Sequence, residues 1–188
     1  IADKSMAEQS KILDTIKSKL IQANTDTTSA DGRTAIAKDV SKLLEQLNNI
    51  AKQTNYNGTN LLQAAATSTA TKTALSFQIG ENPSDMIETA AIQANTLGYG
   101  LDTLSAAAGT GASAAAGASV FTRAQATAGQ TAVDTAITKL NGYRGDIGST
   151  QNQVESAVRN LMTQATNIKN AESVIRDVDY AEESANFN

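Results

Sequence analysis

The chain has 188 residues, a net charge of −4, and neither His nor Cys. Its acidic balance argues against nucleic acid, which needs a basic surface, and no apolar run reaches membrane-spanning length. The absence of Cys excludes disulfides and thiol chemistry, and the absence of His removes the commonest general base and metal ligand.

Residues 1–60 are predicted to form two helices. Met6, Leu13 and Leu20 keep a seven-residue step, and turn and capping residues at 25–32 separate this helix from the next. The second helix repeats its apolar residues in steps of four and three and ends at an Asn-Gly turn at 57–58, where positive φ costs little. The predicted core positions of the two helices are Leu13, Ile16, Leu20, Ile36, Val40, Leu43, Leu47 and Ile50.

Residues 61–105 are predicted to contain turns and a β-hairpin. Residues 75–80 alternate apolar and polar side chains, residues 81–85 hold the single proline, and residues 86–94 supply the return strand. Residues 106–121 follow as a separate segment. Because residues 106–119 are only Ala, Gly, Ser and Thr, they have too little apolar bulk for a core, and we expect an exposed, mobile loop.

Residues 122–188 are predicted to form one long helix. Its apolar residues again alternate in steps of four and three, which is the narrow seam of a helix that winds around partner helices. Gly142, Gly145 and Gly148 favour a break, at about 1 kcal/mol each relative to Ala, but the heptad phase continues across them. A break there is the alternative. The predicted core positions are Val154, Val158, Leu161, Ile168 and Ile175.

The matching seams predict a mainly α protein, an elongated antiparallel helical bundle or coiled coil with a small β-hairpin, all in one domain. We expect no catalytic, cofactor or metal site. Ser and Thr are plentiful, but no base accompanies them. A carboxylate group near the C-terminus is interpreted as a solvated helix face rather than a cation site, and comprises Asp177, Asp179, Glu182 and Glu183. Asn57-Gly58-Thr59 matches the N-glycosylation pattern, but a helix-terminating turn is the simpler interpretation.

Several runs resemble bacterial flagellin, the subunit of the flagellar filament, in its epsilonproteobacterial form. The C-terminal helix carries two of them, at residues 144–153 and 171–183. Residues 1–6 and 12–17 resemble the first outer-tube helix of that family, residues 47–62 the second helix and its following turn, and residues 77–80 the first hairpin strand. These matches occur in the family's order over nearly the whole chain.

The resemblance implies a structural, self-assembling motility protein outside the cell, exported by the flagellar secretion apparatus. Its implied partners are other flagellin subunits, export chaperones and assembly factors. The family's inner-tube helices are expected to lie outside this chain, and residues 106–121 replace the larger surface domains. Two alternatives are a hook–filament junction protein and a flagellin-derived surface adhesin. Agreement at residues 175–183 favours the filament subunit, and the aromatic residues are too scattered for a sugar-binding groove.

Two further groups of residues follow from the resemblance. Flagellins of this type carry O-linked sugars on exposed Ser and Thr, for which the candidates here are Thr103, Ser105, Thr110, Ser113, Ser119 and Thr122. Flagellins that activate the vertebrate Toll-like receptor for flagellin present Arg and Leu on the first helix and Glu on the second. The equivalent positions here are Thr15, Lys19 and Asp39. The resemblance therefore implies a weak ligand of that receptor.

Overall fold

The computed structural model describes residues 1–25, 27–64, 74–80, 82–113 and 121–187. It divides into two compact units, Ile1–Leu75 with Thr89–Gly148 and Ser76–Glu88 with Ser149–Asn188. Each unit is described in turn.

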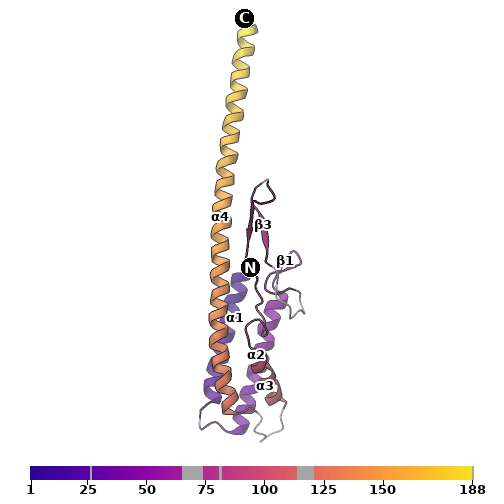
Figure 1. Cartoon of the computed structure of the whole chain (residues 1–188), viewed down its shortest axis with the longest axis vertical. Helices are drawn as coiled ribbons and strands as arrows, with labels where there is room; N and C mark the ends of the chain where they lie inside the picture. The colour runs from indigo at the N-terminus through magenta and orange to yellow at the C-terminus, as the bar shows by residue number, and fades with distance from the viewer. Residues whose placement is uncertain (26, 65–73, 81, 114–120, 188) are drawn as a thin grey trace. The chain divides into compact units, whose positions relative to one another are not determined.

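The described residues of the first unit form three complete helices and the beginning of a fourth, and these helices are labelled in Figure 1. They are α1 (Ala2–Ala23), α2 (Ala30–Gln53), α3 (Asp102–Ala112) and the N-terminal part of α4 (Arg123–Phe187). Ser29 begins α2, because its side-chain oxygen accepts a hydrogen bond from the backbone N–H of Gly32 at 3.1 Å. The two predicted N-terminal helices and the turn between them are confirmed.

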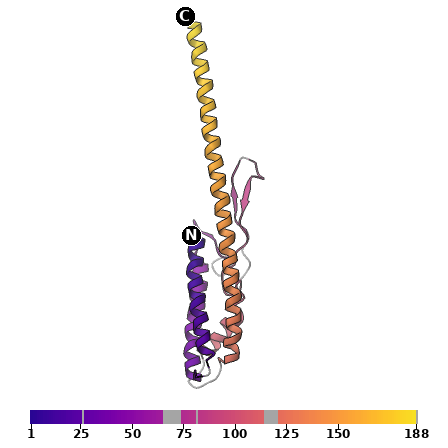
Figure 2. The same cartoon turned by 90° about the vertical axis from the view of Figure 1, so that its left-hand side faces the viewer.

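Cross-helix contacts fix the directions of these helices. Ser5 near the start of α1 bonds Thr54 just after α2, whereas Lys19 near the end of α1 pairs with Asp39 in α2. The two helices are therefore antiparallel. The same reversal links α1 to α4, because Asp3 contacts Arg144 while Lys17 contacts Asp134. Both views of the chain show α1, α2 and the first part of α4 running alongside one another (Figures 1 and 2).

A two-residue turn closes a short hairpin directly after α2. Strands β1 (Asn55–Tyr56) and β2 (Thr59–Asn60) pair antiparallel, and the connecting Asn57 and Gly58 have φ of 51° and 81°. Positive φ at both central positions is the requirement of a type I′ hairpin turn, which Asn-Gly meets at low cost. The predicted turn is thus present, and the small strand pair that flanks it is an addition to the prediction.

The core of the first unit follows the predicted seams of α1 and α2 closely. Leu13, Ile16, Leu20, Val40 and Leu47 have no exposed surface, and Ile36 is 6% exposed. On α2 the buried positions are Leu44 and Ala51, whereas the predicted Leu43 and Ile50 are only partly buried. The heptad phase was therefore one residue off at these two points, because α2 packs on both α1 and α3 and buries a broader face than a coiled-coil seam.

The expected loop at residues 106–121 is wrong for residues 106–112, which belong to helix α3. Leu104, Ala108 and Gly111 form its buried face, and α3 packs against α2. Small side chains permit this close packing, since a Cβ on Gly111 would lie 2.9 Å from the Ala37 Cβ. Ala is also the strongest helix former, so a run without bulky residues forms a helix once one face is buried. Residues 114–120 lie outside the described residues.

The second unit consists of a β-hairpin and the C-terminal part of α4. Strands β3 (Ser76–Gln78) and β4 (Met86–Glu88) pair antiparallel, with Phe77 opposite Ile87. The predicted hairpin is confirmed, with a shorter return strand. The helix α4 is continuous from Arg123 to Phe187, so the predicted long helix is confirmed and its glycines do not break it.

The predicted core positions in the C-terminal part of α4 are not part of this chain's core. Val154 is half-buried, and Val158, Leu161, Ile168 and Ile175 are 47%, 43%, 69% and 64% exposed. The correction has a simple physical reason: a heptad seam identifies the face that packs against a partner helix but does not supply the partner. Within the described ranges, no helix combines the length and hydropathy that a membrane crossing requires.

Candidate functional site

A buried glutamine joins three segments of the first unit. The Gln9 side-chain amide donates hydrogen bonds to the backbone oxygens of Leu47, at 3.1 Å, and Ala94, at 2.7 Å. The Tyr99 hydroxyl donates to the Gln9 side-chain oxygen at 2.8 Å. Gln9 is fully buried and Tyr99 is 1% exposed. Since buried polar atoms are costly without partners, this network holds α1, α2 and the segment after β4 in one register.

Sequence analysis missed Gln9, although a signal was present. It lies in the seam of α1, three residues after Met6 and four before Leu13. A polar side chain at a seam position is a known device for specifying how helices align.

Tyr99 is the titratable group that this packing changes most. Burial raises the pKa of the Tyr99 hydroxyl well above its ordinary value, and the charge of the neighbouring Tyr143 adds to this effect. The two rings lie 6.0 Å apart, tilted by 42°. The hydroxyl therefore stays protonated in the folded state, where it can donate to Gln9.

We expect this raised pKa to weaken the fold in alkaline solution. The unfolded chain releases the Tyr99 proton from about pH 10 upwards, while the folded chain retains it. The contribution of this hydroxyl to the free energy of unfolding is therefore fully present below about pH 10 and falls above it. The loss from this one group should reach about 2 kcal/mol at pH 11.5. Urea unfolding of the native protein and of Tyr99→Phe at pH 8 and pH 11.5 measures it.

The Tyr99→Phe variant should be less stable at pH 8 but should lose less stability on going to pH 11.5. Tyr180→Phe is the matched control, because Tyr180 is 76% exposed. Equal alkaline losses in the native protein and Tyr99→Phe would contradict the prediction.

Other hydrogen bonds fasten the segment that carries Tyr99. Asn48 of α2 accepts from the Thr96 backbone N–H at 2.8 Å, and Lys139 of α4 donates to the Gly98 carbonyl at 2.6 Å. The Ala94 N–H donates to the Leu62 carbonyl at 2.7 Å. Such an arrangement of satisfied buried polar groups holds the helices and this segment in place.

In the first unit, α4 buries its apolar face, whereas in the second unit the apolar face of α4 is exposed. We call the exposed α4 residues Leu161, Ile168 and Ile175, with Val158 beside them, the distal stripe. Leu161, Ile168 and Ile175 are spaced by seven residues, so they share one face of the helix. Monomeric proteins seldom expose apolar side chains in such an ordered row, so the stripe is the chain's best candidate for a protein-contact surface.

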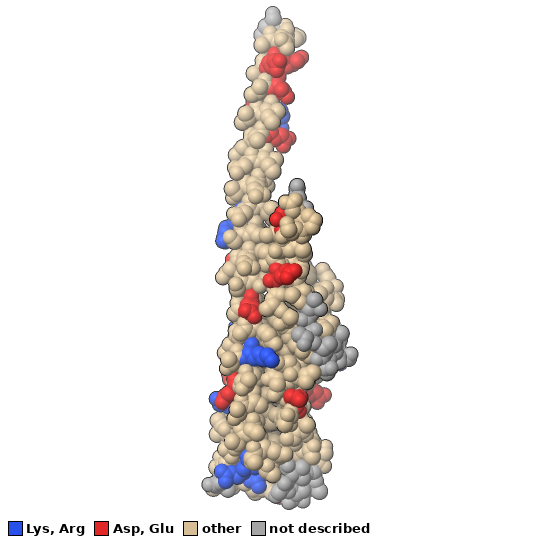
Figure 3. Space-filling view, in the orientation of Figure 1, with Lys and Arg blue, Asp and Glu red and all other residues tan. Residues whose placement is uncertain are grey.

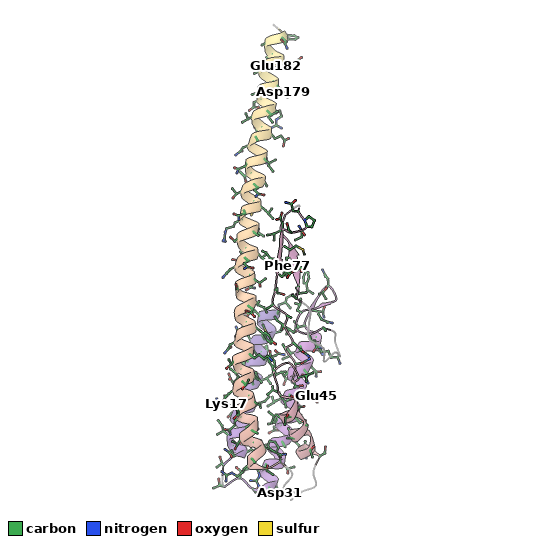
Figure 4. All side chains as sticks on the ribbon, in the orientation of Figure 1. Lys17, Asp31, Glu45, Phe77, Asp179 and Glu182 are labelled. Atoms are coloured by element: carbon green, nitrogen blue, oxygen red, sulfur yellow. The ribbon has the colours of Figure 1, made fainter. Side chains whose placement is uncertain are left out.

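An open groove of about 1020 Å³ runs between the hairpin and this part of α4. Its floor includes Met86 and Ile87 from the hairpin and Leu161 and Ile168 from the distal stripe. The C-terminal end of α4 beyond the groove is acidic in the space-filling view (Figure 3). Asp179 and Glu182 are exposed on that end of the helix, as their labelled positions show (Figure 4).

The three positions implied for receptor contact lie on the surface of α1 and α2. Thr15 is exposed, and its hydroxyl donates to the Lys11 carbonyl of its own helix at 3.0 Å. Lys19 and Asp39 pair with each other at 3.3 Å. The structure thus brings two of the three positions together, in an ion pair.

Of the candidate glycosylation positions, Thr103, Ser105 and Thr110 lie in α3, Ser113 directly follows it, and Thr122 directly precedes α4. Thr103, Thr110, Ser113 and Thr122 are exposed, and Ser105 is half-buried. Ser119 lies outside the described residues. The three candidates in α3 therefore lie in a folded helix rather than in a loop, and modification of all six positions stays a prediction.

Comparison with known families assigns the fold. The model of the bacterial flagellin N-terminal helical region matches residues 1–67, and that of the bacterial flagellin C-terminal helical region matches residues 130–188. The chain belongs to the flagellin family. The matched regions contain α1, α2 and nearly all of α4, so both the core seams and the distal stripe lie in flagellin helices.

Individual flagellins support this assignment. The flagellar filament 30.7 kDa core protein of Treponema maltophilum is 29% identical over 97% of this chain and 62% of its own length. Flagellin B of Helicobacter pylori strain J99 is 40% identical over 46% of this chain, which is 18% of its own length. The chain thus spans less than two thirds of either relative.

The crystal structure of Bacillus cereus flagellin superposes with a TM-score of 0.61 at 28% identity. The superposition covers 89% of this chain and 85% of the Bacillus cereus chain. The mainly helical architecture with a small hairpin is therefore that of a flagellin.

Proposed function

We propose that this chain is part of a structural subunit of the bacterial flagellar filament. The distal stripe carries the proposal. Its residues have the spacing of a coiled-coil seam and are exposed, whereas the N-terminal part of the same helix packs in the core of the first unit. A subunit that assembles through helix–helix contacts needs such a surface. The Treponema relative is named as a filament core protein, which agrees with this function.

The proposal has consequences for partners and location. Other flagellin subunits are the partners that a heptad stripe fits, and flagellar export chaperones and assembly factors would handle the chain before it reaches the filament outside the cell. Flagellins are structural proteins, and the buried hydrogen bonds of Gln9 and Tyr99 join packed segments of the first unit, which supports a structural role. We therefore propose a role without catalysis.

The test places aspartates on the distal stripe. A protein carrying Leu161→Asp, Ile168→Asp and Ile175→Asp, expressed as the sole flagellin of a flagellin-deficient bacterium, should form no filaments, because each charge would be buried unpaired in the seam. We expect swimming to be lost and filaments to be absent in electron micrographs. Circular dichroism of the purified variant should show that the first unit remains folded.

The matched control carries Thr163→Asp, Thr166→Asp and Asn170→Asp. These exposed residues lie outside the seam on the same stretch of α4, so the change in charge is identical. The control should retain filaments. Normal filaments from the stripe variant, or loss of filaments in both, would overturn the assembly role of the stripe.

A specific observation favours a second proposal, that this flagellin binds the flagellin-sensing Toll-like receptor weakly. Asp39 at one receptor-equivalent position pairs with Lys19, and Lys19 places a hydrated ammonium where the resemblance implies an apolar side chain. The exposed hydroxyl of Thr15 cannot replace the planar, multi-donor guanidinium of Arg.

A further inference from the structure

The sequence contains two Asn-Gly pairs, Asn57-Gly58 and Asn141-Gly142, in different backbone settings. Both asparagines and both glycines are exposed. A Cβ added at either glycine would meet no neighbouring atom within 4 Å, so packing shields neither pair. The backbone around each pair is therefore what distinguishes them.

Asn57-Gly58 forms the loop between β1 and β2. The hydrogen bonds of a two-residue hairpin join the flanking strands, here with Tyr56 opposite Thr59, so the Gly58 N–H lies outside the ladder. Each strand has two residues, and strands this short contribute little stability of their own. The loop can thus open at low cost, which lets the Asn57 side chain approach the Gly58 nitrogen.

Asn141-Gly142 lies inside α4, where each backbone N–H bonds to the carbonyl four residues earlier. The Gly142 nitrogen is therefore held within the helix. Side chains on both sides hold this part of α4 in place, because Leu140 is fully buried and the Tyr143 ring lies 6.0 Å from that of Tyr99. Rotation about Asn141 requires consecutive helical bonds to break, so its side chain seldom meets the next nitrogen.

We propose that Asn57 is a site of spontaneous covalent modification, in which its side-chain amide is lost through a succinimide. The Gly58 nitrogen attacks the side-chain carbonyl carbon of Asn57, and glycine offers no side chain to hinder this approach. The bond from that carbon to the side-chain nitrogen breaks. The proton lost by the Gly58 nitrogen is balanced by the proton that the departing group gains, so ammonia leaves. Water then opens the ring at either of its two carbonyls, which gives aspartate or isoaspartate.

The two products act differently on the hairpin. Both add a negative charge to the net charge of −4. Aspartate keeps the backbone unchanged, whereas isoaspartate routes it through the former side chain and lengthens the loop by a carbon atom. Because loop length selects the turn type, isoaspartate no longer fits the type I′ turn. It should therefore loosen the adjoining bond from the Leu61 N–H to the Thr54 carbonyl. The inference goes beyond a filament role, because it concerns a chemical change in the chain itself.

Peptide mapping by mass spectrometry tests the site. The native chain is incubated at pH 8, and samples taken over time are analysed for aspartate and isoaspartate at both Asn-Gly pairs. Asn57 should convert at least about tenfold faster than Asn141, because local opening of a short hairpin costs less than opening of a packed helix. In urea that unfolds the chain, the two asparagines should convert at nearly equal rates, since neither is then held by structure.

The Asn57→Asp variant separates the effect of charge from that of the backbone. It carries the charge of the modified chain on a normal backbone, and Asp tolerates the positive φ of this position. The Leu61 amide should exchange with solvent as slowly in this variant as in the native chain. In the isoaspartate fraction, isolated by chromatography, the same amide should exchange about tenfold faster or more.

Two results would overturn the site. One is equal conversion of Asn57 and Asn141 in the folded chain. The other is an unchanged Asn57 in the folded chain over an interval in which both asparagines convert in urea. Equal exchange of the Leu61 amide in the isoaspartate fraction and in Asn57→Asp would refute the effect on the hairpin. Because none of these measurements depends on filament formation, failure of this site and failure of the proposed filament role are distinguishable.

Discussion

Replacing Gln9 by alanine is expected to lower the free energy of unfolding by about 3 kcal/mol or more. The change leaves two buried groups without their partner, the Ala94 carbonyl and the Tyr99 hydroxyl, and it removes a second hydrogen bond from the Leu47 carbonyl, which lies inside α2. Each orphaned buried group costs about 1–3 kcal/mol, and the cavity left by the lost side chain adds to the loss. Urea unfolding followed by circular dichroism at pH 7 measures the effect.

Gln22→Ala is the control for this prediction. Gln22 lies on the same helix but is exposed, so its loss should change stability by no more than about 0.5 kcal/mol. A double variant, Gln9→Ala with Tyr99→Phe, should be less destabilised than the sum of the single changes, because one orphaned hydroxyl has been removed. If Gln9→Ala were as stable as Gln22→Ala, the network would have no structural importance.

The helices could be predicted because their signal is local. Steps of three and four, as from Leu13 to Ile16 and from Ile16 to Leu20, need only the neighbouring residues to indicate which face is buried. The Asn57-Gly58 turn was likewise predictable, since few other dipeptides adopt positive φ twice in succession.

Features that depend on distant residues were harder to predict. The three partners of Gln9 come from α2 and from the segment after β4, so no local pattern shows that its amide is satisfied. Helix α3 was mistaken for a loop because its small residues have no strong amphipathic pattern. Its stability comes from α2, which accepts a face of Leu104 and Ala108. Composition distinguishes bulky from small residues, but it does not show where another helix lies close enough to cover small ones.

The distal stripe illustrates the opposite case. Its heptad spacing was recognised correctly, but the inference that Ile168 and Ile175 lie in this chain's core was wrong. Spacing encodes a helix face and its preference for a partner, whether that partner is in the same chain or another. The exposure of the stripe, known only from the structure, is the reason that we propose an assembly role for it.

The receptor-equivalent positions give the last prediction. Thr15→Arg together with Lys19→Leu should raise activation of the flagellin-sensing Toll-like receptor by at least tenfold. The first change supplies a guanidinium that can bond in several directions, and the second supplies an apolar anchor and releases Asp39 from its ion pair. An anchor residue contributes about 2 kcal/mol or more at an interface, and 1.4 kcal/mol corresponds to tenfold in affinity. A reporter-cell assay over a concentration series measures the shift.

The control must introduce the same side chains elsewhere on α1. Ser18→Arg with Lys11→Leu does so, and it also removes an exposed ion pair, because Lys11 contacts Glu8 at 3.5 Å. All four positions avoid the core, so both variants should unfold like the native protein. The control should activate the receptor no better than the native chain. Potent activation by the native chain, or equal gains in both variants, would show that weak receptor engagement does not arise from Thr15 and Lys19. A gain confined to the first variant would instead assign the weak receptor binding to Thr15 and Lys19, since both variants introduce the same two side chains on the same helix and leave the net charge unchanged.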